Sequence, residues 1–202
     1  EDAFNKSIEA FEQGPDSIAQ FSTLRGLAKL YALRGDIRGP QLGDALVGLR
    51  ARENNPTMMI EALLVGGTAR MFMGNLQSGR DDLERAISLF PSIPEHAFSS
   101  HPGTDPRVVC LNAAALTWWQ MGYPDRAVAR ADAALKLAAE IEHPFTIAYA
   151  HFHAGLLHLW GRDFAVAVEL MQRLLVLARE HGFQIWRAAG TVLLGAAQAG
   201  LG

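Results

Sequence analysis

The stretch EHPFTIAYAHFHAGLLHLWGRDFAVAVELMQRLLVLAREHGF, residues 142–183, contains one complete unit of the repeat that decides the fold. It opens with Glu142-His-Pro-Phe145 and closes with Glu180-His-Gly-Phe183, so three of four residues recur at a distance of 38. Two helix-length windows of small and apolar residues lie between them, on either side of the turn Gly161-Arg162-Asp163. Self-similarity at this period predicts stacked helical hairpins.

Similar turns recur along the whole chain. Anchored on Gly35, Gly74, Gly122, Arg162 and Gly200, the intervals are 39, 48, 40 and 38 residues. Sustained alternation of apolar and polar residues and hairpin-type Asn-Gly or Asp-Gly turns are missing, which argues against strands. The sequence therefore predicts an all-α, right-handed superhelix (an α-solenoid) of about five hairpins and about ten helices. The expected helices cover about 2–13, 17–33, 38–53, 57–73, 76–90, 107–121, 124–141, 145–160, 164–181 and 184–199.

The residues around each turn favour helix ends. Prolines fall near four expected helix starts, where a missing N–H is tolerated, and Asp or Asn precedes three second helices as a candidate cap. Each first helix carries a pair of small residues at mid-length, and Ala127 and Ala167 lie early in second helices. This spacing resembles the tetratricopeptide repeat. The prolines are Pro40, Pro56, Pro124 and Pro144; the candidate caps are Asp36, Asn75 and Asp163; the small pairs are Gly66-Gly67, Ala114-Ala115 and Ala154-Gly155.

Residues 91–106 break the repeat period by about eight residues. Four prolines and Gly103 exclude a regular helix there. Two readings stay open. The segment is either a solvated linker between sub-arrays covering about 1–90 and 107–202, or an ordered loop that packs Phe98 against the stack and shapes one rim.

Composition excludes several functional classes. Half of the 202 residues are apolar and the formal net charge is −3, so the chain is neither disordered nor basic enough for nucleic acid. The most apolar stretch has the composition of a buried helix rather than of a membrane span. A single cysteine suits a reducing compartment, and we expect a cytoplasmic protein. The chain begins inside an expected helix without Met, and we expect a fragment of a larger multidomain protein.

Motifs for catalysis are also missing. The sequence has no phosphate-binding Gly-Lys-Ser/Thr loop, no Gly-x-Ser-x-Gly elbow and no His-Glu-x-x-His helix. We therefore expect no enzyme activity, no cofactor and no metal in this segment. His151 and His158 lie on one helical face, but nothing completes a metal site around them. They are interpreted as satisfied histidines at helix contacts.

Two weaker chemical readings involve the loop. His96 and His101 with Asp105 could form a surface metal site, and Cys110 could be a nucleophile beside either histidine. Cys110 stands early in an apolar helix, so a buried structural thiol is the favoured interpretation.

The sequence also resembles a known group of proteins. From Asp105 to Leu194 it is similar to the C-terminal helical-repeat region of large bacterial proteins. In these, a class III adenylate/guanylate cyclase domain, or a kinase or LuxR-type regulator domain, precedes an AAA/STAND-type ATPase module and then the repeats. The resemblance implies a regulatory or sensory arm without cyclase or ATPase residues of its own. It rests on residues 103–106, 109–111, 115–116, 118–119, 121–127, 142–145, 148–153, 178–183 and Trp186.

In tetratricopeptide arrays the first helices line a concave groove, and that likeness supplies a candidate site. The groove would be aromatic and apolar, as suits an interface with a protein partner or with other domains of the same polypeptide. The alternative is a site for a small-molecule effector, with polar contacts from Asn112, Gln120 and Arg187. An apolar end face near 186–201 further predicts a homodimer of the fragment. The groove residues are Leu64, Met71, Phe72, Asn112, Leu116, Trp119, Gln120, Tyr149, Phe152, Leu156, Trp160 and Arg187.

Overall fold

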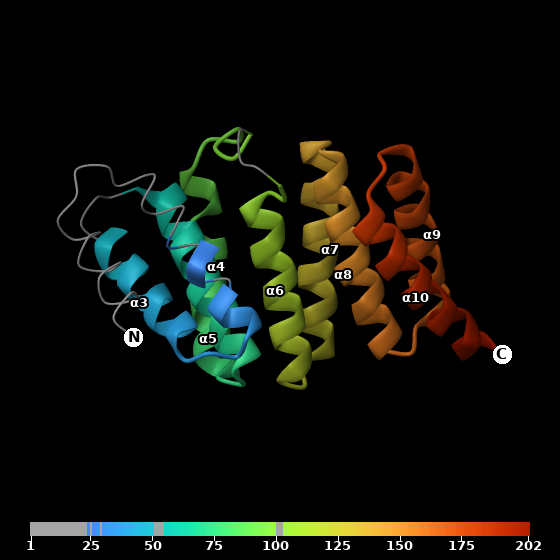
Figure 1. Ribbon diagram of the computed structural model, residues 1–202, viewed down its shortest axis with the longest axis horizontal. Helices are drawn as coiled ribbons and strands as arrows, with labels where there is room; N and C mark the ends of the chain where they lie inside the picture. Colours follow the sequence, from blue (N-terminus) through green and yellow to red (C-terminus); the bar gives the residue numbers. More distant parts are fainter. Residues whose placement is uncertain (1–23, 25, 29, 51–54, 100–102) are drawn as a thin grey trace. The chain divides into compact units, whose positions relative to one another are not determined.

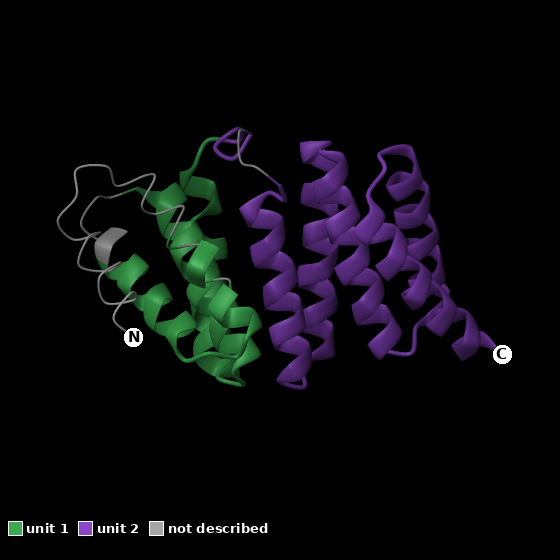
Figure 2. Ribbon diagram, viewed as in Figure 1, with its two compact units in different colours: residues 1–94 green, residues 95–202 purple. Residues whose placement is uncertain are grey.

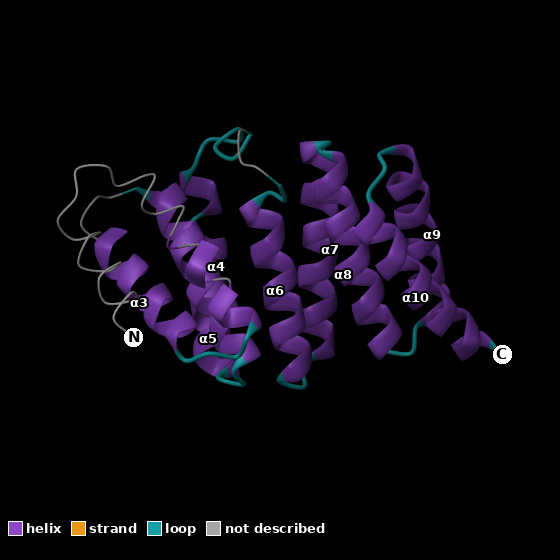
Figure 3. Cartoon of the chain, in the orientation of Figure 1, coloured by secondary structure: helices purple, strands orange, loops and turns teal. Residues whose placement is uncertain are grey.

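The computed structural model describes residues 24, 26–28, 30–50, 55–99 and 103–202. Every regular element in these ranges is helical, and none of them contains a strand (Figure 3). The predicted all-α fold class is therefore confirmed. The helix expected at 2–13 and most of the one expected at 17–33 lie outside the described residues, although residues 30–33 are helical.

The chain divides into two compact units, 1–94 and 95–202 (Figure 2). The division falls within the segment that breaks the repeat period. In the first unit, α3 (Arg38–Arg50) packs on α4 (Pro56–Phe72), and α4 packs on α5 (Leu76–Ser88), which is followed by the short 3-10 helix η1 (Phe90–Ser92). Helices α4 and α5 form one hairpin.

The second unit is a stack of two hairpins and one further helix (Figure 1). The hairpins are α6 (Pro106–Gln120) with α7 (Pro124–Ile141), and α8 (Pro144–Trp160) with α9 (Phe164–Glu180); α10 (Gln184–Leu201) follows. Each helix packs on the next in sequence, and α8 also contacts α6 and α10. The first helices of successive repeats, α6, α8 and α10, therefore lie side by side on one face of this unit.

Most helix boundaries, including that of the last helix, agree with the sequence prediction to within two residues, but the turn expected at Gly200 does not form. The sequence pattern predicts a turn at Gly200, whereas α10 continues through it to Leu201. Glycine at this position serves a packing contact instead of a turn: a Cβ on Gly200 would lie 2.5 Å from the ring of Phe164. Glycine at this position allows α10 to approach the start of α9.

Helices begin at prolines and at side-chain caps, but two of the expected caps do not form. Prolines stand at the first position of α4, α6, α7 and α8, where the missing N–H leaves no intrahelical bond unmade. Asp36 Oδ1 accepts the backbone N–H of Arg38 at 3.0 Å, as expected. Asn75 and Asp163 make no such cap. Two caps that the sequence pattern did not indicate are Asn55 and Asp105, which accept backbone N–H groups of α4 and α6.

The pairs of small residues lie where the hairpins close. Ala114, Ala115 and Ala154 are at most 2% exposed, and so are Ala127 and Ala167 on the second helices. A Cβ on Gly155 would lie 2.3 Å from the terminal methyl of Met171 on α9. Small side chains at these positions let the two helices of each pair approach closely, which confirms the packing role that the spacing predicts.

Candidate functional site

The residues predicted to line a groove fall into buried and accessible groups. Leu64, Met71 and Asn112 are 4%, 6% and 1% exposed, so these three cannot contribute to an accessible surface, and that part of the prediction is corrected. Packing within the helix stack takes up their side chains. Asn112 Nδ2 donates to the carbonyl oxygen of Val108 at 2.9 Å, whereas its buried Oδ1 has no hydrogen-bond partner among the described residues.

Two further predicted groove residues pack mainly against other side chains of the second unit. The rings of Tyr149 and Phe152 on α8 lie 5.9 and 5.4 Å from Trp186 on α10. Burial raises the pKa of the Tyr149 phenol well above its ordinary value. Leu116 and Leu156 are partly buried, and Leu116 also packs on this core. The ring contacts of Tyr149 and Phe152 with Trp186 join the neighbouring first helices α8 and α10, and they leave less of these two side chains for a partner.

Most of the predicted groove residues that stay accessible in the second unit lie at the C-terminal ends of α6 and α8. The indole rings of Trp119 and Trp160 lie 6.5 Å apart with planes tilted by 36°. Trp160 is 43% exposed, Trp119 is partly buried, and the adjacent Gln120 is exposed. We refer to Trp119 and Trp160 as the tryptophan pair. Arg187 on α10 is exposed as well, and Phe72 is 52% exposed in the first unit.

The histidines of α8 make local hydrogen bonds. Nδ1 of His151 and of His153 pair with the carbonyl oxygens of Ile147 and Tyr149, at 2.8 and 2.9 Å. Burial lowers the pKa of both imidazoles, that of His153 to about 4. Nδ1 of His158 lies 3.2 Å from Asp163 Oδ2. The described ranges hold no group of three His, Cys, Asp or Glu arranged to bind a metal.

The two chemical readings of the loop do not gain support. His101 lies outside the described residues, and Asp105 is engaged with Arg107. Cys110 is 0% exposed, which confirms the interpretation as a buried thiol. Among the described helices, none is long and apolar enough to cross a membrane.

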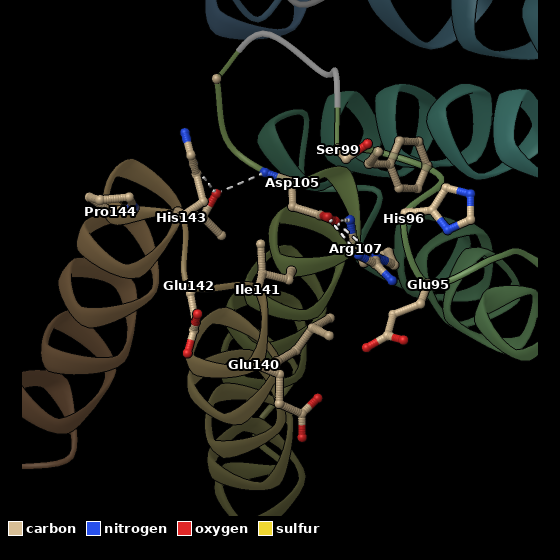
Figure 4. A pocket seen from close by; sticks show the side chains of 14 residues that line it. Glu95, His96, Ser99, Asp105, Arg107, Glu140, Ile141, Glu142, His143 and Pro144 are labelled. Carbon is tan, nitrogen blue, oxygen red and sulfur yellow. Dashed lines mark hydrogen bonds and ion pairs between the residues drawn. The ribbon is translucent and has the colours of Figure 1, made fainter.

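The structure adds a cavity that the sequence pattern did not predict. It has a volume of about 670 Å³ and lies in the second unit, between loop residues 95–99 and 103–105, the end of α7 and the start of α8 (Figure 4). The sequence feature that pointed to this region is the insertion into the repeat, which one of the two interpretations treats as an ordered loop that shapes one rim of the stack. Phe98 is 5% exposed, and the Arg107 guanidinium lies 5.8 Å from its ring, so this part of the loop is packed rather than solvated.

A buried ion pair forms one wall of this cavity. Asp105 and Arg107 are 5% and 8% exposed, and their side chains pair through Nε at 3.1 Å and Nη2 at 2.8 Å. Asp105 Oδ1 also accepts the backbone N–H of Arg107, and the Asp105 N–H donates to Thr146 Oγ1 at 3.2 Å. Thr146 Oγ1 lies 2.9 Å from Nδ1 of His143. Hydrogen bonds thus connect the loop to the start of α8 (Figure 4).

The apolar end face expected near 186–201 corresponds to the outer side of α10. Ile185, Val192 and Leu201 are 66%, 70% and 59% exposed, whereas Trp186 is buried. Dimerisation through this face stays a prediction.

Comparison with solved structures identifies the architecture. The fold is that of TPR-like helical repeats. Two crystal structures of a Podosopora anserina putative kinesin light chain with nearly identical TPR-like repeats match 90% of this chain and 86% of theirs. Both have a TM-score of 0.67, at 17% and 16% sequence identity. No family model and no curated protein sequence matches the chain. At this identity the likeness concerns the fold.

Proposed function

We propose that this chain is a non-catalytic protein-interaction module that binds a partner through the tryptophan pair. The observation that carries the proposal is the exposure of Trp160 beside Trp119 on the face shared by α6 and α8. Tryptophan supplies a large rigid contact area, and it is enriched among the residues that dominate binding energy at interfaces. TPR-like folds generally serve protein–protein recognition, which agrees with this role.

The proposed partner is a protein segment of the same signalling system. The resemblance to bacterial cyclase and STAND-type ATPase proteins makes flanking domains of the same polypeptide the first candidates, within the cytoplasm. Domains encoded next to this segment can be produced separately and titrated against it. Capture of one of them through the tryptophan pair would supply the regulatory contact that such an arm needs.

The test compares Trp160→Ala with Val176→Ala. Val176 is 51% exposed on α9, so its truncation also removes an exposed apolar side chain, but on a second helix. Loss of a central aromatic contact lowers affinity by about tenfold or more, whereas Val176→Ala should leave affinity unchanged. Equal affinities of the two variants for the flanking domains, with wild-type thermal stability, would refute this binding surface.

A second candidate function is that of a small-molecule effector-sensing arm. The observation in its favour is the 670 Å³ cavity beside α7 and α8, which lies in the size range of ligand sites. The cavity and the tryptophan pair share no residue, so the two functions can be tested separately.

A further inference from the structure

The exposed side of α10 carries a polar strip and an apolar strip. At about 100° per residue, Gln184, Thr191 and Gln198 fall in the polar strip, and Arg187 lies beside them. The second strip lies within about 60° of Val192 and contains no polar side chain. The exposed side of a surface helix is ordinarily polar, so an exposed apolar strip indicates a surface for association. We refer to this strip as the α10 strip; its exposed residues are Ile185, Ala188, Val192, Gly195, Ala196 and Ala199.

The preceding repeat buries the equivalent positions. Ala150, Ala154 and Leu157 of α8 stand 38 positions before three residues of the α10 strip, and each is at most 1% exposed. Helix α8 packs on both α7 and α9. Helix α10 packs on α9 and α8, yet Val192 is 70% exposed and a Cβ on Gly195 would have no neighbouring atom within 4 Å. The α10 strip is thus a packing surface of the repeat that no described helix covers.

The spacing of the α10 strip is symmetrical about Val192. Ala188 and Ala196 stand four residues on either side of it. Ile185 and Ala199 stand seven residues on either side. When a second α10 lies antiparallel, with the two Val192 side chains in contact, each of these residues therefore faces a strip residue of the other copy. Such self-complementarity is what a two-fold interface between identical chains requires.

Side-chain size and charge both favour the antiparallel arrangement. It places Ile185 of each copy opposite Ala199 of the other, large against small, so the two helices can pack evenly along their length. A parallel pair would bring the two isoleucines together at one end and leave a gap between the two alanines at the other. Arg187 is the only charged residue of α10, and the antiparallel pair separates the two Arg187 positions by about 15 Å along the helix axis. A parallel pair would bring these like charges to the same level.

We propose that two copies of this chain associate through their α10 strips as an antiparallel helix pair. The strip contains no charge and no side-chain hydrogen-bonding group, so its occupant must also be apolar, because a buried unpaired polar group is costly. A second α10 strip meets this requirement. Each α10 then covers, in the other copy, a surface whose equivalent on α8 is buried. The proposal depends on neither the tryptophan pair nor the cavity.

The oligomeric state of the whole 202-residue chain tests the proposal. A single pair of helices is a small interface, so we expect a weak dimer with a Kd of about 10–100 µM in sedimentation equilibrium. Added salt should change this Kd little, because the contact is apolar rather than ionic. A chain that stays monomeric at about 0.5 mM would overturn the proposal.

Two glutamate substitutions at adjacent positions separate the α10 strip from the rest of the helix. Val192→Glu places two carboxylates in contact at the two-fold axis and should weaken the dimer by at least about tenfold. Thr191→Glu is the matched control, because it adds the same charge to the polar strip and should leave the Kd unchanged. Both residues are exposed, so both variants should fold, and circular dichroism checks this. Equal effects of the two substitutions on the dimer would exclude the α10 strip as the interface.

Cysteine cross-linking tests the antiparallel pairing. Ala188→Cys in one copy faces Ala196→Cys in the other, so a mixture of the two variants should form a disulfide-linked dimer on oxidation. Either variant alone should cross-link far less, because identical positions are about 12 Å apart along the helix axis. The native Cys110 is buried and does not compete. Efficient cross-linking of Ala188→Cys alone, or none in the mixture, would contradict the antiparallel pair.

A last variant distinguishes this dimer from the proposed function. Trp160→Ala should leave the Kd of the dimer unchanged, since Trp160 does not belong to the α10 strip. A monomeric chain whose flanking domains bind to the α10 strip would assign the strip to those domains and overturn the dimer. Neither result alters the test of the tryptophan pair, so failure of the two proposals can be told apart.

Discussion

Phe145 and Phe183 occupy the same position in successive repeats, and their rings contact each other edge to face. The centroids are 5.1 Å apart and the ring planes meet at 83°. The two residues are 38 positions apart. Phe145 lies in the first turn of α8, and Phe183 immediately precedes α10. A residue that recurs in sequence at the repeat period is thus brought into contact with its own equivalent. The repeat motif itself supplies part of the stacking energy between neighbouring hairpins.

A double-mutant cycle on Phe145 and Phe183 should detect this contact. Each Phe→Leu change lowers the free energy of unfolding, and the coupling between them should be about 0.5–1.5 kcal/mol, as for aromatic pairs in this geometry. Urea denaturation of the four proteins measures it. Strictly additive effects would show that the two rings stabilise the fold independently.

Alanine substitution of two glycines in α3 should change the free energy of unfolding in opposite directions. A Cβ on Gly43 would lie 2.4 Å from Cα of Gly66 on α4, so Gly43→Ala forces the two backbones apart and should cost about 1–3 kcal/mol. A Cβ on Gly48 would have no neighbouring atom within 4 Å, and Gly48→Ala should stabilise α3 by about 0.5–1 kcal/mol. Thermal denaturation of both variants compares them directly. Similar changes in Tm would contradict the close approach of α3 and α4.

Replacing Arg162 with glycine should stabilise the fold. Its φ is 60°, in the left-handed region, at the end of α8 where Gly122 holds φ 84° in the preceding repeat. Arg162→Gly should raise the free energy of unfolding by about 0.5–1 kcal/mol, since a side chain is strained in this conformation. Gly122→Ala should lower it by a similar amount. Chemical denaturation of each variant against wild type tests both signs.

His153 should make stability depend on pH. Burial lowers its folded-state pKa from 6.5 to about 4, so between these values the unfolded chain binds the proton more readily than the folded one. The stabilising contribution of the neutral imidazole is therefore complete above pH 6.5 and is lost as pH falls towards 4. Burial also lowers the pKa of His151, so the contribution of His151 to stability is likewise lost as pH falls.

His153→Gln should flatten this dependence. The measurement is the free energy of unfolding of wild type and variant at several pH values between 4 and 6.5. The difference between the two proteins should shrink as pH falls, because the wild-type advantage is lost. Parallel curves over the whole range would mean that His153 does not titrate differently in the folded state.

The fold could be predicted because its information is local and repeated. Positive-φ turns at Gly74 and Gly122, prolines at helix starts and pairs of small residues each specify one hairpin independently. Errors occurred where a residue contacts a side chain of a different helix. Gly200 lies within α10, close to the ring of Phe164, instead of forming a turn, and Asp163 interacts with His158 instead of capping α9.

The candidate site was predicted less completely. The repeat register correctly indicates which residues lie on first helices, but it does not distinguish the buried Asn112 from the exposed Gln120 further along the same helix. Accessibility depends on which neighbouring helix covers each position. The cavity could not be foreseen, because it requires a loop, the end of α7 and the start of α8 to meet around the Asp105–Arg107 pair.

The amino-acid pattern alone specifies the helical class, the hairpin period and nearly every helix boundary in the described ranges. These properties follow from short-range chemistry: helix periodicity, backbone freedom at turns and capping. Tertiary packing was needed to establish that Tyr149 and Phe152 pack on Trp186, that Trp160 stays exposed, and that part of the inserted loop is packed around Phe98. Burial is a property of neighbours that are remote in sequence, and a pattern of residue types does not specify the distances between them.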